Sequence, residues 1–231
     1  MIDVVIGHGL ADDPIRVRAR GYVAGLYESQ GYRVHLAQCP TAEWSKGAAV
    51  NPVANQTTSE ILILADADSF VAGDHLDRAI GQARVRGWAM PHSTVKRLDR
   101  ESSDRLIRGI PGRQRLERSA YPALPGGGIV IVTRETWDLV GGFDPRFRGW
   151  GGEDHAFGLA LRCLTGNEIN PRRICPLIHL WHPEAPNCRR PSDNNRWLDK
   201  RYRDARRDPD LMRELVEEAR RWESQPASYA H

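Results

Sequence analysis

Short runs of apolar and β-branched residues alternate along this chain with segments whose apolar residues recur at helical spacing. The first run, Ile2–Ile6, predicts a strand. Arg16–Gln30 predicts a helix, because its apolar positions fall on one face of a helix. Gly31 ends that helix, and Tyr32–Ala37 predicts a second strand. A strand–helix–strand opening favours a parallel sheet, so we predict an α/β fold.

The alternation continues through the first half of the chain. Lys46–Ala54 and Gly73–Arg86 are predicted helices, and Trp88–Pro91 is a further short strand. Between the two helices, Ile61–Ala65 is a continuous apolar run. Strands of parallel sheets are buried on both faces and are therefore apolar at nearly every position, so we expect this run at the centre of the sheet.

Residues 92–124 interrupt the pattern. They contain eight basic and four acidic residues, and long segments of this kind in compact domains are usually functional or disordered. We therefore predict a long, basic and partly mobile loop. Beyond it the pattern predicts strands at Ile129–Thr133 and Arg173–Leu180, and helices at Arg134–Val140, Glu153–Cys163, Arg196–Arg207 and Asp210–Trp222. The last two helices are polar and Arg-rich, and we expect them on the outside.

Composition narrows the class of protein without identifying it. The 231 residues suit one domain, and 33 basic against 30 acidic residues give a net charge of +3, too little to indicate nucleic-acid binding. No apolar run approaches the ~20 residues of a membrane-spanning helix, and the N-terminus lacks the basic segment of a signal peptide. The four cysteines show no Cys-x-x-Cys spacing, so we expect reduced thiols and a cytoplasmic protein.

Two carboxylates directly follow the central apolar run. Asp66 and Asp68 occupy alternate positions, so extended backbone would point both side chains to the same side. Ligands of open α/β sheets bind beyond the carboxyl ends of the strands, and two neighbouring anions favour a cation beside them. Hard oxygen ligands suit Mg²⁺ or Mn²⁺, which also bind a diphosphate. The plainer interpretation is that both aspartates cap a turn or a helix.

A second acidic pair ends the segment Trp150-Gly-Gly-Glu153-Asp154. Its glycines allow the backbone to approach a ligand closely, and its two acids begin a helix. The helix dipole favours carboxylates in a first turn, so capping alone would account for them. An indole beside two acids also suits a sugar, whose apolar face stacks on the ring while its hydroxyls meet the carboxylates. A carboxylate within reach of an acceptor hydroxyl can act as its general base.

Together the two sites resemble those of GT-A glycosyltransferases, over residues 2–183. Asp66-Ala67-Asp68 resembles the Asp-x-Asp motif of that family. Pro125-Gly-Gly-Gly, Gly141-Gly-Phe-Asp-Pro and Trp150-Gly-Gly-Glu-Asp resemble, in this order, the segment shared by β-1,4-galactosyltransferases, polypeptide N-acetylgalactosaminyltransferases and bacterial chondroitin-type polymerases. The resemblance implies a Rossmann-like, mostly parallel central sheet flanked by helices, with Mn²⁺ or Mg²⁺ as cofactor. It also implies transfer of a hexose or N-acetylhexosamine from a UDP-sugar, with inversion at the anomeric carbon.

The resemblance assigns roles to individual residues. Asp68 would ligate the metal, and Asp66 would contact the donor ribose or a metal-bound water. Glu153 would hold the donor or acceptor sugar, and Asp154 would be the catalytic base. The other residues that it places at the donor are Asp12 and Arg16 at the nucleobase and phosphates, Lys46 and Asn51 under the nucleotide, Gly126, Gly127 and Gly128 along the sugar, and Trp150.

Two histidines follow the last predicted strand, in the sequence His179-Leu-Trp-His182. The related galactosyltransferases complete their metal site at this place and spacing, and imidazole is a good ligand of Mn²⁺. The resemblance therefore implies that His182 is a metal ligand, with His179 as the second or alternative one. A structural zinc site is the competing interpretation. Cys175 and Cys188 would complete a Cys₂His₂ set, although their spacing is not that of a standard zinc finger.

The resemblance also suggests how the chain is organised. Residues 1–188 would form the catalytic domain, with a nucleotide-binding half at 1–91, the basic loop at 92–124 and an acceptor half at 125–188. Residues 189–231 would form an Arg-rich helical extension, whose mixed charges suit a solvated surface.

The acceptor remains open. Arginines of the basic loop suit a diphosphate, and they equally suit an anionic acceptor such as DNA. A glycan, a protein and a modified DNA base are all compatible with the sequence. Two other functions also remain: a retaining transferase or nucleotidyltransferase on the same fold, and a non-catalytic sugar- or nucleic-acid-binding module with a structural zinc.

Overall fold

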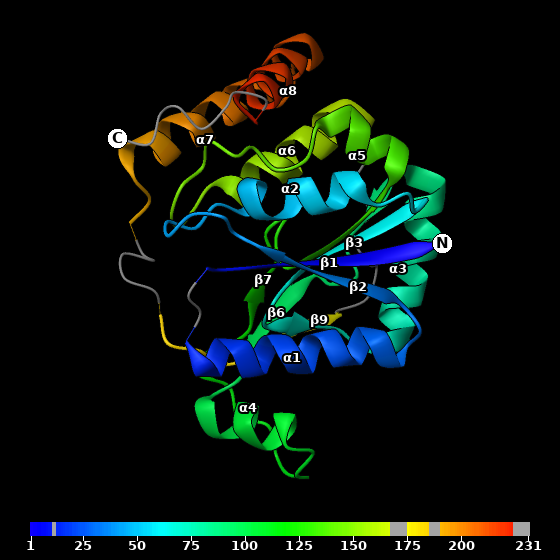
Figure 1. Ribbon diagram of the computed structural model, residues 1–231, viewed down its shortest axis with the longest axis vertical. Coiled ribbons are helices and arrows are strands. Elements are labelled where there is room, and N and C mark those ends of the chain that lie inside the picture. Colours follow the sequence, from blue (N-terminus) through cyan, green and yellow to red (C-terminus); the bar gives the residue numbers. More distant parts are fainter. Residues whose placement is uncertain (11–12, 167–174, 185–189, 224–231) are drawn as a thin grey trace.

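The computed structural model of the chain has a five-stranded central sheet with the order β2-β1-β3-β8-β5 (Figure 1). The structure describes residues 1–10, 13–166, 175–184 and 190–223. The strands of this sheet are β1 (Ile2–His8), β2 (Arg33–Gln38), β3 (Ile61–Asp66), β5 (Trp88–Ala89) and β8 (Ile129–Thr133). β1 pairs in parallel with β2 and β3, whereas β8 is antiparallel to β3 and to β5. β8 therefore runs against the other four strands, and the predicted mostly parallel α/β sheet is confirmed.

Helices cover both faces of the central sheet (Figure 1). On one face lie α1 (Pro14–Ser29) and α3 (Gly73–Arg86), and on the other α2 (Lys46–Gln56), α5 (Arg134–Val140) and α6 (Glu153–Thr165). Alternate residues of β3 serve the two cores: Ile61 and Ile63 pack with α1 and α3, whereas Leu62 and Leu64 pack with α2, α5 and α6. None of the four is more than 3% exposed, as expected for a strand buried on both faces.

Polar caps fix where the helices after β1 and β2 begin. Asp13 Oδ1 accepts hydrogen bonds from two backbone N–H groups of α1, at 2.8 and 3.2 Å, and Pro14 follows at the first helical position. Ser45 Oγ caps α2 through the N–H of Ala48 at 3.4 Å. Each helix therefore starts close to the carboxyl end of the strand before it, where α/β sheets bind their ligands.

The structure contains a second sheet that the sequence pattern does not predict, with the order β4-β9-β6-β7. Its strands are β4 (Ser69–Phe70), β6 (Thr94–Arg97), β7 (Tyr121–Pro122) and β9 (Pro176–His179). β9 lies within the strand predicted at Arg173–Leu180, but the other three strands are too short to show a period, and the pairing partners lie far away in the sequence. Because Ser69 pairs with His179, this sheet brings the chain after β3 next to the end of β9.

The segment expected to form one long loop, residues 92–124, contains regular structure, and its mobility stays a prediction. The segment forms β6, the helix α4 (Arg100–Ile107) and β7, and α4 projects from the body of the molecule (Figure 1). Asp99 caps α4 by accepting from the N–H of Ser102 at 2.7 Å, and Ser102 Oγ accepts from the N–H of Arg115 at 2.8 Å. These two hydrogen bonds fix the start of α4 and attach the chain near Arg115 to it. They do so in a segment as rich in charged residues as a solvated loop.

The C-terminal helices α7 (Asp193–Ala205) and α8 (Pro209–Glu223) pack over α6 (Figure 1). Leu198, Tyr202, Met212 and Leu215 are buried in the core that α2 and α6 share. The charged side chains predicted from the sequence lie on the outer surfaces of these helices, while their apolar sides extend the core. No helix in the described ranges is both long enough and apolar enough to cross a membrane.

Candidate metal centre and active site

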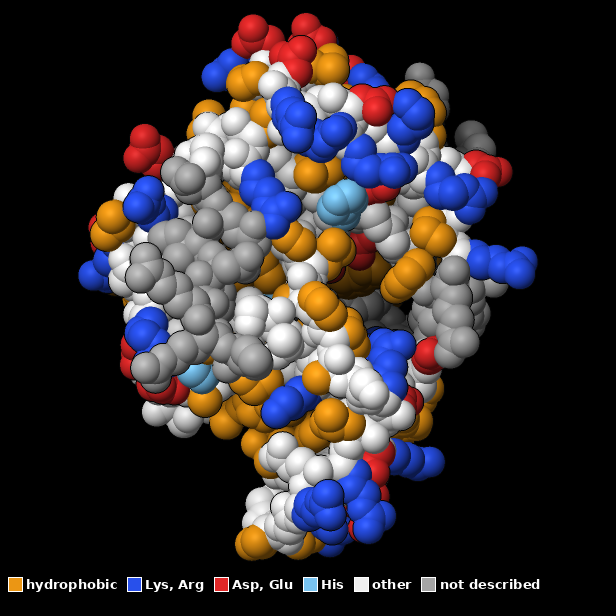
Figure 2. Space-filling model, turned by 180° about the vertical axis from the view of Figure 1, so that it is seen from behind, with side chains coloured by type: hydrophobic (Ala, Val, Ile, Leu, Met, Phe, Trp, Pro, Cys, Tyr) orange, Lys and Arg blue, Asp and Glu red, His pale blue; other side chains and the backbone are white. Residues whose placement is uncertain are grey.

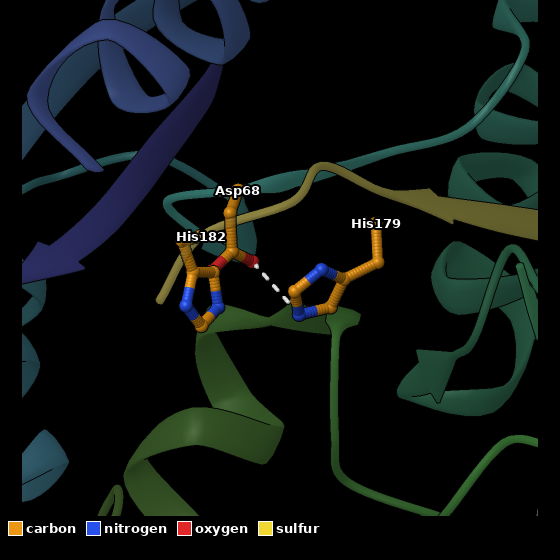
Figure 3. Close-up of side chains that lie close together, drawn as sticks. All are labelled: Asp68, His179 and His182. Carbon is orange, nitrogen blue, oxygen red and sulfur yellow. Dashed lines mark ion pairs between the residues drawn. The ribbon is translucent and has the colours of Figure 1, made fainter. Parts of the chain in front are cut away.

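Asp68, His179 and His182 form a cluster at the junction of the two sheets (Figure 3). Asp68 lies in the turn between β3 and β4, His179 ends β9, and His182 follows it. Asp68 Oδ2 is 3.1 Å from His182 Nε2, and Asp68 Oδ1 is 3.5 Å from His179 Nε2. One ligand atom from each residue lies within 4.8 Å of the others. A hydrogen bond of 2.8 Å from the N–H of Leu180 to the carbonyl of Asp68 holds the two segments together.

Both imidazoles are oriented as metal ligands. His179 Nδ1 is 2.7 Å from the carbonyl oxygen of Leu180, and His182 Nδ1 is 2.8 Å from that of Pro183. A carbonyl oxygen only accepts, so each Nδ1 carries a proton, and each Nε2 is the nitrogen that faces Asp68. Metal-binding histidines commonly use such a backbone contact to fix the tautomer. One carboxylate and two imidazoles that turn Nε2 toward it suit Mn²⁺, so the residues present fit this cofactor.

The charges of the cluster favour the same state. Burial opposes ionisation of Asp68, but its contacts with His179, His182 and Ser69 outweigh burial, so the pKa of Asp68 lies below its usual value. Burial lowers the pKa of His179, and the neighbouring Arg97 lowers it further, against the attraction of Asp68. An ionised aspartate beside a neutral histidine is the protonation state that a divalent cation requires.

Among the described residues, the alternative Cys₂His₂ zinc site does not form. Cys175 Sγ is 3.1 Å from His75 Nδ1, at the start of α3, and the cysteine is absent from the cluster around Asp68. Cys188 lies outside the described residues. The two histidines are therefore grouped with an aspartate and not with the thiol of Cys175.

Lys46 joins the two acidic motifs. Its Nζ lies 2.7 Å from Asp66 Oδ1 and 2.8 Å from Asp154 Oδ1, and its side chain is only 9% exposed. Burial disfavours the charged amine, but the two carboxylates raise the pKa of Lys46 above its usual value. For Asp66 burial outweighs the attraction of Lys46, and the pKa of this carboxyl rises to about 6. The Asp66–Asp68 turn thus links the metal cluster to Asp154 through one ammonium group.

Glu153 has an unused acceptor in this network. Burial, with the neighbouring charge of Asp154, raises the pKa of Glu153 to about 7. Its Oε2 atom is buried and has no hydrogen-bond partner among the described residues. Buried polar atoms are nearly always satisfied, so an unsatisfied carboxyl oxygen beside two other acids suggests a place for a ligand hydroxyl.

The three glycines at 126–128 fit against both motifs. Gly126 has φ +87°, and a Cβ there would lie 2.1 Å from the carbonyl oxygen of Asp154. A Cβ at Gly127 would lie 3.2 Å from Asp154 Oδ2, and the carbonyl of Gly128 accepts from the N–H of Asp66 at 2.9 Å. Only glycine allows this approach, so the segment packs beside the acids with little side-chain bulk.

The loop that carries Trp150 is held by α7. Asn195, which is 1% exposed, donates from Nδ2 to the carbonyls of Arg148 (2.8 Å) and Gly151 (2.9 Å), with a longer contact to that of Trp150 (3.3 Å). The indole of Trp150 remains 51% exposed. Asn195 thus fixes the backbone while the ring faces solvent, as a surface that stacks on a sugar requires. Sequence analysis missed Asn195 because nothing distinguishes it within a polar helix.

Asn51, expected under the nucleotide, has a structural role. Its side chain is 1% exposed and exchanges two hydrogen bonds with the backbone of Phe143, accepting from N–H at 3.0 Å and donating to the carbonyl at 2.8 Å. It braces the turn that follows α5, and its place under a nucleotide stays a prediction. Arg16 lies in the first turn of α1 and donates to the carbonyl of Pro183, the residue after His182, at 3.0 Å. Asp12 lies outside the described residues.

Another residue that sequence analysis did not single out is Arg97, which ends β6. Its Nη2 lies 2.6 Å from Nε2 of His179, and its Nε is buried with no hydrogen-bond partner in the described part of the chain. Sequence analysis counted Arg97 among eight basic residues of the expected loop. The register of β6 against β9, which pairs Arg97 with His179, could not be read from that pattern.

The face opposite to that of Figure 1 is hollowed near its middle (Figure 2). Lys and Arg side chains are spread over this face, from the C-terminal helices at the top to α4 at the bottom, with acidic and apolar side chains between them. A DNA-binding surface would gather its basic side chains along one track. The basic residues visible on this face therefore do not single out DNA as the acceptor.

Comparisons with known proteins agree with this fold. Residues 115–170 match the family model described as the N-terminal domain of galactosyltransferase, which spans the glycine segment and α6. No curated protein matches the chain in sequence. Solved structures match at low identity. GalNAc-T7 with UDP, GalNAc and Mn²⁺ is 14% identical, with a TM-score of 0.50, over 95% of this chain and 55% of that one.

Two further structures cover more of their own length. The catalytic domain of Drosophila β1,4-galactosyltransferase 7, in complex with xylobiose, is 13% identical over 86% of this chain and 79% of that one, with a TM-score of 0.49. Glucosyl-3-phosphoglycerate synthase from Mycobacterium tuberculosis, with Mn²⁺, UDP and glucosyl-3-phosphoglycerate, is 14% identical over 89% and 79%, with a TM-score of 0.45. The chain has the GT-A fold, and this likeness is one of fold.

Proposed function

We propose that this protein is a metal-dependent glycosyltransferase. It would transfer a hexose or N-acetylhexosamine from a UDP-sugar to an acceptor hydroxyl, with inversion at the anomeric carbon. One observation carries the proposal: the Asp66–Asp68 turn joins a cluster of metal-ligand type to a buried Lys46–Asp154 pair. The galactosyltransferase match at residues 115–170 and the UDP and Mn²⁺ bound in GalNAc-T7 support it.

The metal cluster would serve the leaving group. Asp68, His182 and His179 would hold Mn²⁺ or Mg²⁺, which neutralises charge on a departing nucleoside diphosphate. The glycines at 126–128 would leave room for the donor sugar beside Asp154. The unsatisfied Oε2 of Glu153 would accept a sugar hydroxyl, and the exposed indole of Trp150 would stack on the acceptor.

Asp154 would be the general base. Lys46 holds its Oδ1 atom at 2.8 Å, which leaves Oδ2, on the side of Gly127, for the acceptor hydroxyl. The hydroxyl proton passes to Asp154 as the acceptor oxygen bonds to the anomeric carbon. The bond from that carbon to the diphosphate oxygen breaks, and its electron pair leaves with the diphosphate. A single displacement of this kind inverts the anomeric centre.

A panel of nucleotide-sugars tests the proposal. We expect hydrolysis of at least one UDP-sugar by the purified chain, dependent on added Mn²⁺. We then expect transfer once mass analysis of candidate glycans, proteins and DNA has identified an acceptor. Asp154→Asn should lower transfer by at least about a hundredfold, as for loss of a general base, while UDP·Mn²⁺ binding stays within about twofold. Asp138→Asn, at an exposed acid of α5, is the matched control.

Two results would reject the assignment. If no nucleotide-sugar is hydrolysed with Mn²⁺ or Mg²⁺, the transferase proposal fails. If Asp154→Asn transfers sugar at the wild-type rate, Asp154 is not the base. The anomeric configuration of the product, measured by NMR, separates the inverting reaction from a retaining one, and release of sugar 1-phosphate instead of UDP would indicate a nucleotidyltransferase.

A further inference from the structure

Arg97 occupies the atom of His179 that a metal ion would use. Its Nη2 lies 2.6 Å from His179 Nε2, and the 2.7 Å contact of His179 Nδ1 with the carbonyl of Leu180 places the ring proton on the other nitrogen. The guanidinium only donates, so it donates to the lone pair of Nε2. The register of β6 against β9, in which Arg97 pairs with His179, fixes this contact.

A single lone pair cannot serve both partners. Asp68 Oδ1 is 3.5 Å from the same Nε2 atom, so the position between Asp68 and His179 is where a cation would be shared. While Arg97 donates to Nε2, a metal would be left with Asp68 and His182, which are 3.1 Å apart. Full use of the three ligands therefore requires that Arg97 withdraws from His179.

Arg97 also has unused hydrogen-bonding capacity. Its Nε is buried and has no partner within the described ranges, although buried N–H groups are nearly always paired. A guanidinium presents its donors as a planar fork that matches two oxygens of a phosphate. An arginine beside the metal cluster, with a buried unpaired donor, is suited to the oxygens of a metal-bound diphosphate.

We propose that Arg97 exchanges partners when a nucleoside diphosphate and its metal bind. In the free protein the guanidinium donates to His179. In the complex it donates to diphosphate oxygens, and His179 Nε2 is released to the metal. The metal and the diphosphate thereby bind cooperatively. The diphosphate draws Arg97 away from His179, which frees a ligand for the metal, and a metal that binds His179 frees Arg97 for the diphosphate. This inference rests on the proposed function in that it takes a nucleoside diphosphate as the ligand.

The exchange predicts that one substitution strengthens Mn²⁺ binding and weakens UDP binding. Arg97→Met keeps most of the aliphatic stem and removes the donors. Without nucleotide, we expect it to bind Mn²⁺ about three- to tenfold more tightly than wild type, since a competitor and a repelling charge are lost. At saturating Mn²⁺, UDP should bind at least about tenfold more weakly, as for loss of a charge-assisted hydrogen bond. Electron paramagnetic resonance measures free Mn²⁺, and calorimetry measures UDP binding.

Lys96→Met is the matched control. Lys96 precedes Arg97 on β6, and successive side chains of a strand point to opposite faces. It removes one positive charge from the same strand, so it should leave both affinities within about twofold. The double variant Arg97→Met with His179→Ala checks the mechanism. Without the imidazole there is no lone pair to release, so in this background Arg97→Met should tighten Mn²⁺ binding less than in wild type, by the loss of the repelling charge alone.

The outcomes separate this inference from the proposed function. Unchanged or weaker Mn²⁺ binding by Arg97→Met overturns the exchange, and so does equal weakening of Mn²⁺ and UDP, which would indicate structural damage. If wild type binds Mn²⁺ and UDP cooperatively but transfers no sugar, the transferase proposal fails while the binding data still decide the exchange. If wild type binds neither Mn²⁺ nor UDP, both inferences fall.

Discussion

The ammonium of Lys46 lies 2.8 Å from Asp154 Oδ1, and so connects the start of α2 to the start of α6 across 108 positions of sequence. The same Nζ atom meets Asp66 at 2.7 Å. Asp66 and Asp154 are both partly buried, Glu153 adds a third acid beside Asp154, and their mutual repulsion would otherwise oppose folding. The acidic site is therefore tolerated because a buried cation lies inside it.

Removing that cation should destabilise the fold. Lys46→Met is of similar length but leaves Asp66 and Asp154, which are 35% and 26% exposed, without a counter-ion. We expect a loss of about 1–3 kcal/mol in the free energy of unfolding, below the cost of breaking a fully buried pair, because solvent screens both carboxylates. Urea denaturation at pH 7.5 measures it. Lys46→Arg, which keeps the charge, should lose less. A loss below about 1 kcal/mol for Lys46→Met would contradict the buried ion-pair arrangement.

Glu153 should make stability depend on pH. Burial raises the pKa of Glu153 in the folded protein to about 7, above its ordinary value of 4.5, so the folded state binds the proton more tightly than the unfolded chain. This contribution to stability is complete below pH 4.5 and is lost as the pH rises through 7. Glu153→Gln cannot ionise, so its stability relative to wild type should rise between pH 4.5 and 8. Thermal unfolding across that range checks it, and a pH-independent difference would show that Glu153 titrates normally.

Both histidines of the metal cluster should contribute to Mn²⁺ binding. Mutation of a residue that only hydrogen-bonds to a metal-binding side chain lowers metal affinity about 10–100-fold. Removal of the metal-binding side chain itself should lower it at least as much. We expect His182→Ala to reach this range. His179→Ala should have the smaller effect without nucleotide, because Arg97 occupies its Nε2 atom. His35→Gln, on β2, is the control. Equal affinity in wild type and His182→Ala would remove His182 from the site.

The glycine at position 126 should tolerate no side chain. Gly126→Ala would place a Cβ 2.1 Å from the carbonyl of Asp154, on a backbone with φ +87°. We expect a loss of several kcal/mol in the free energy of unfolding, because backbone strain costs about 1–3 kcal/mol and the clash adds a similar amount. We also expect the start of α6 to be displaced. Gly21→Ala, in α1 with open space around it, should instead stabilise the protein by about 0.5–1 kcal/mol. Comparable unfolding midpoints for the two variants would refute this packing.

Local signals gave much of the fold. The apolar run Ile61–Ala65 is buried because every one of its residues is apolar, and the helix α1 begins where Asp13 and Pro14 predict. The motifs Asp66-Ala-Asp68 and Trp150-Gly-Gly-Glu-Asp could be found because each lies within a few residues. Asp66 lies at the carboxyl end of a parallel strand, whereas Asp154 begins a helix that follows α5, and the packing of that helix against the glycines at 126–128 brings it to the same place.

Sequence by itself therefore determined the central sheet, most of the helices and the candidate chemistry, because periodicity and capping act over about ten residues or fewer. Only the tertiary structure decided how polar groups pair across the chain. It made Lys46 a counter-ion of two acids, used Asn51 to brace Phe143, and set Arg97 against His179. The Arg97–His179 contact depends on the register of two strands 82 residues apart in the sequence, and the Lys46–Asp154 contact depends on the packing of α2 against α6. No local pattern in the sequence encodes either arrangement.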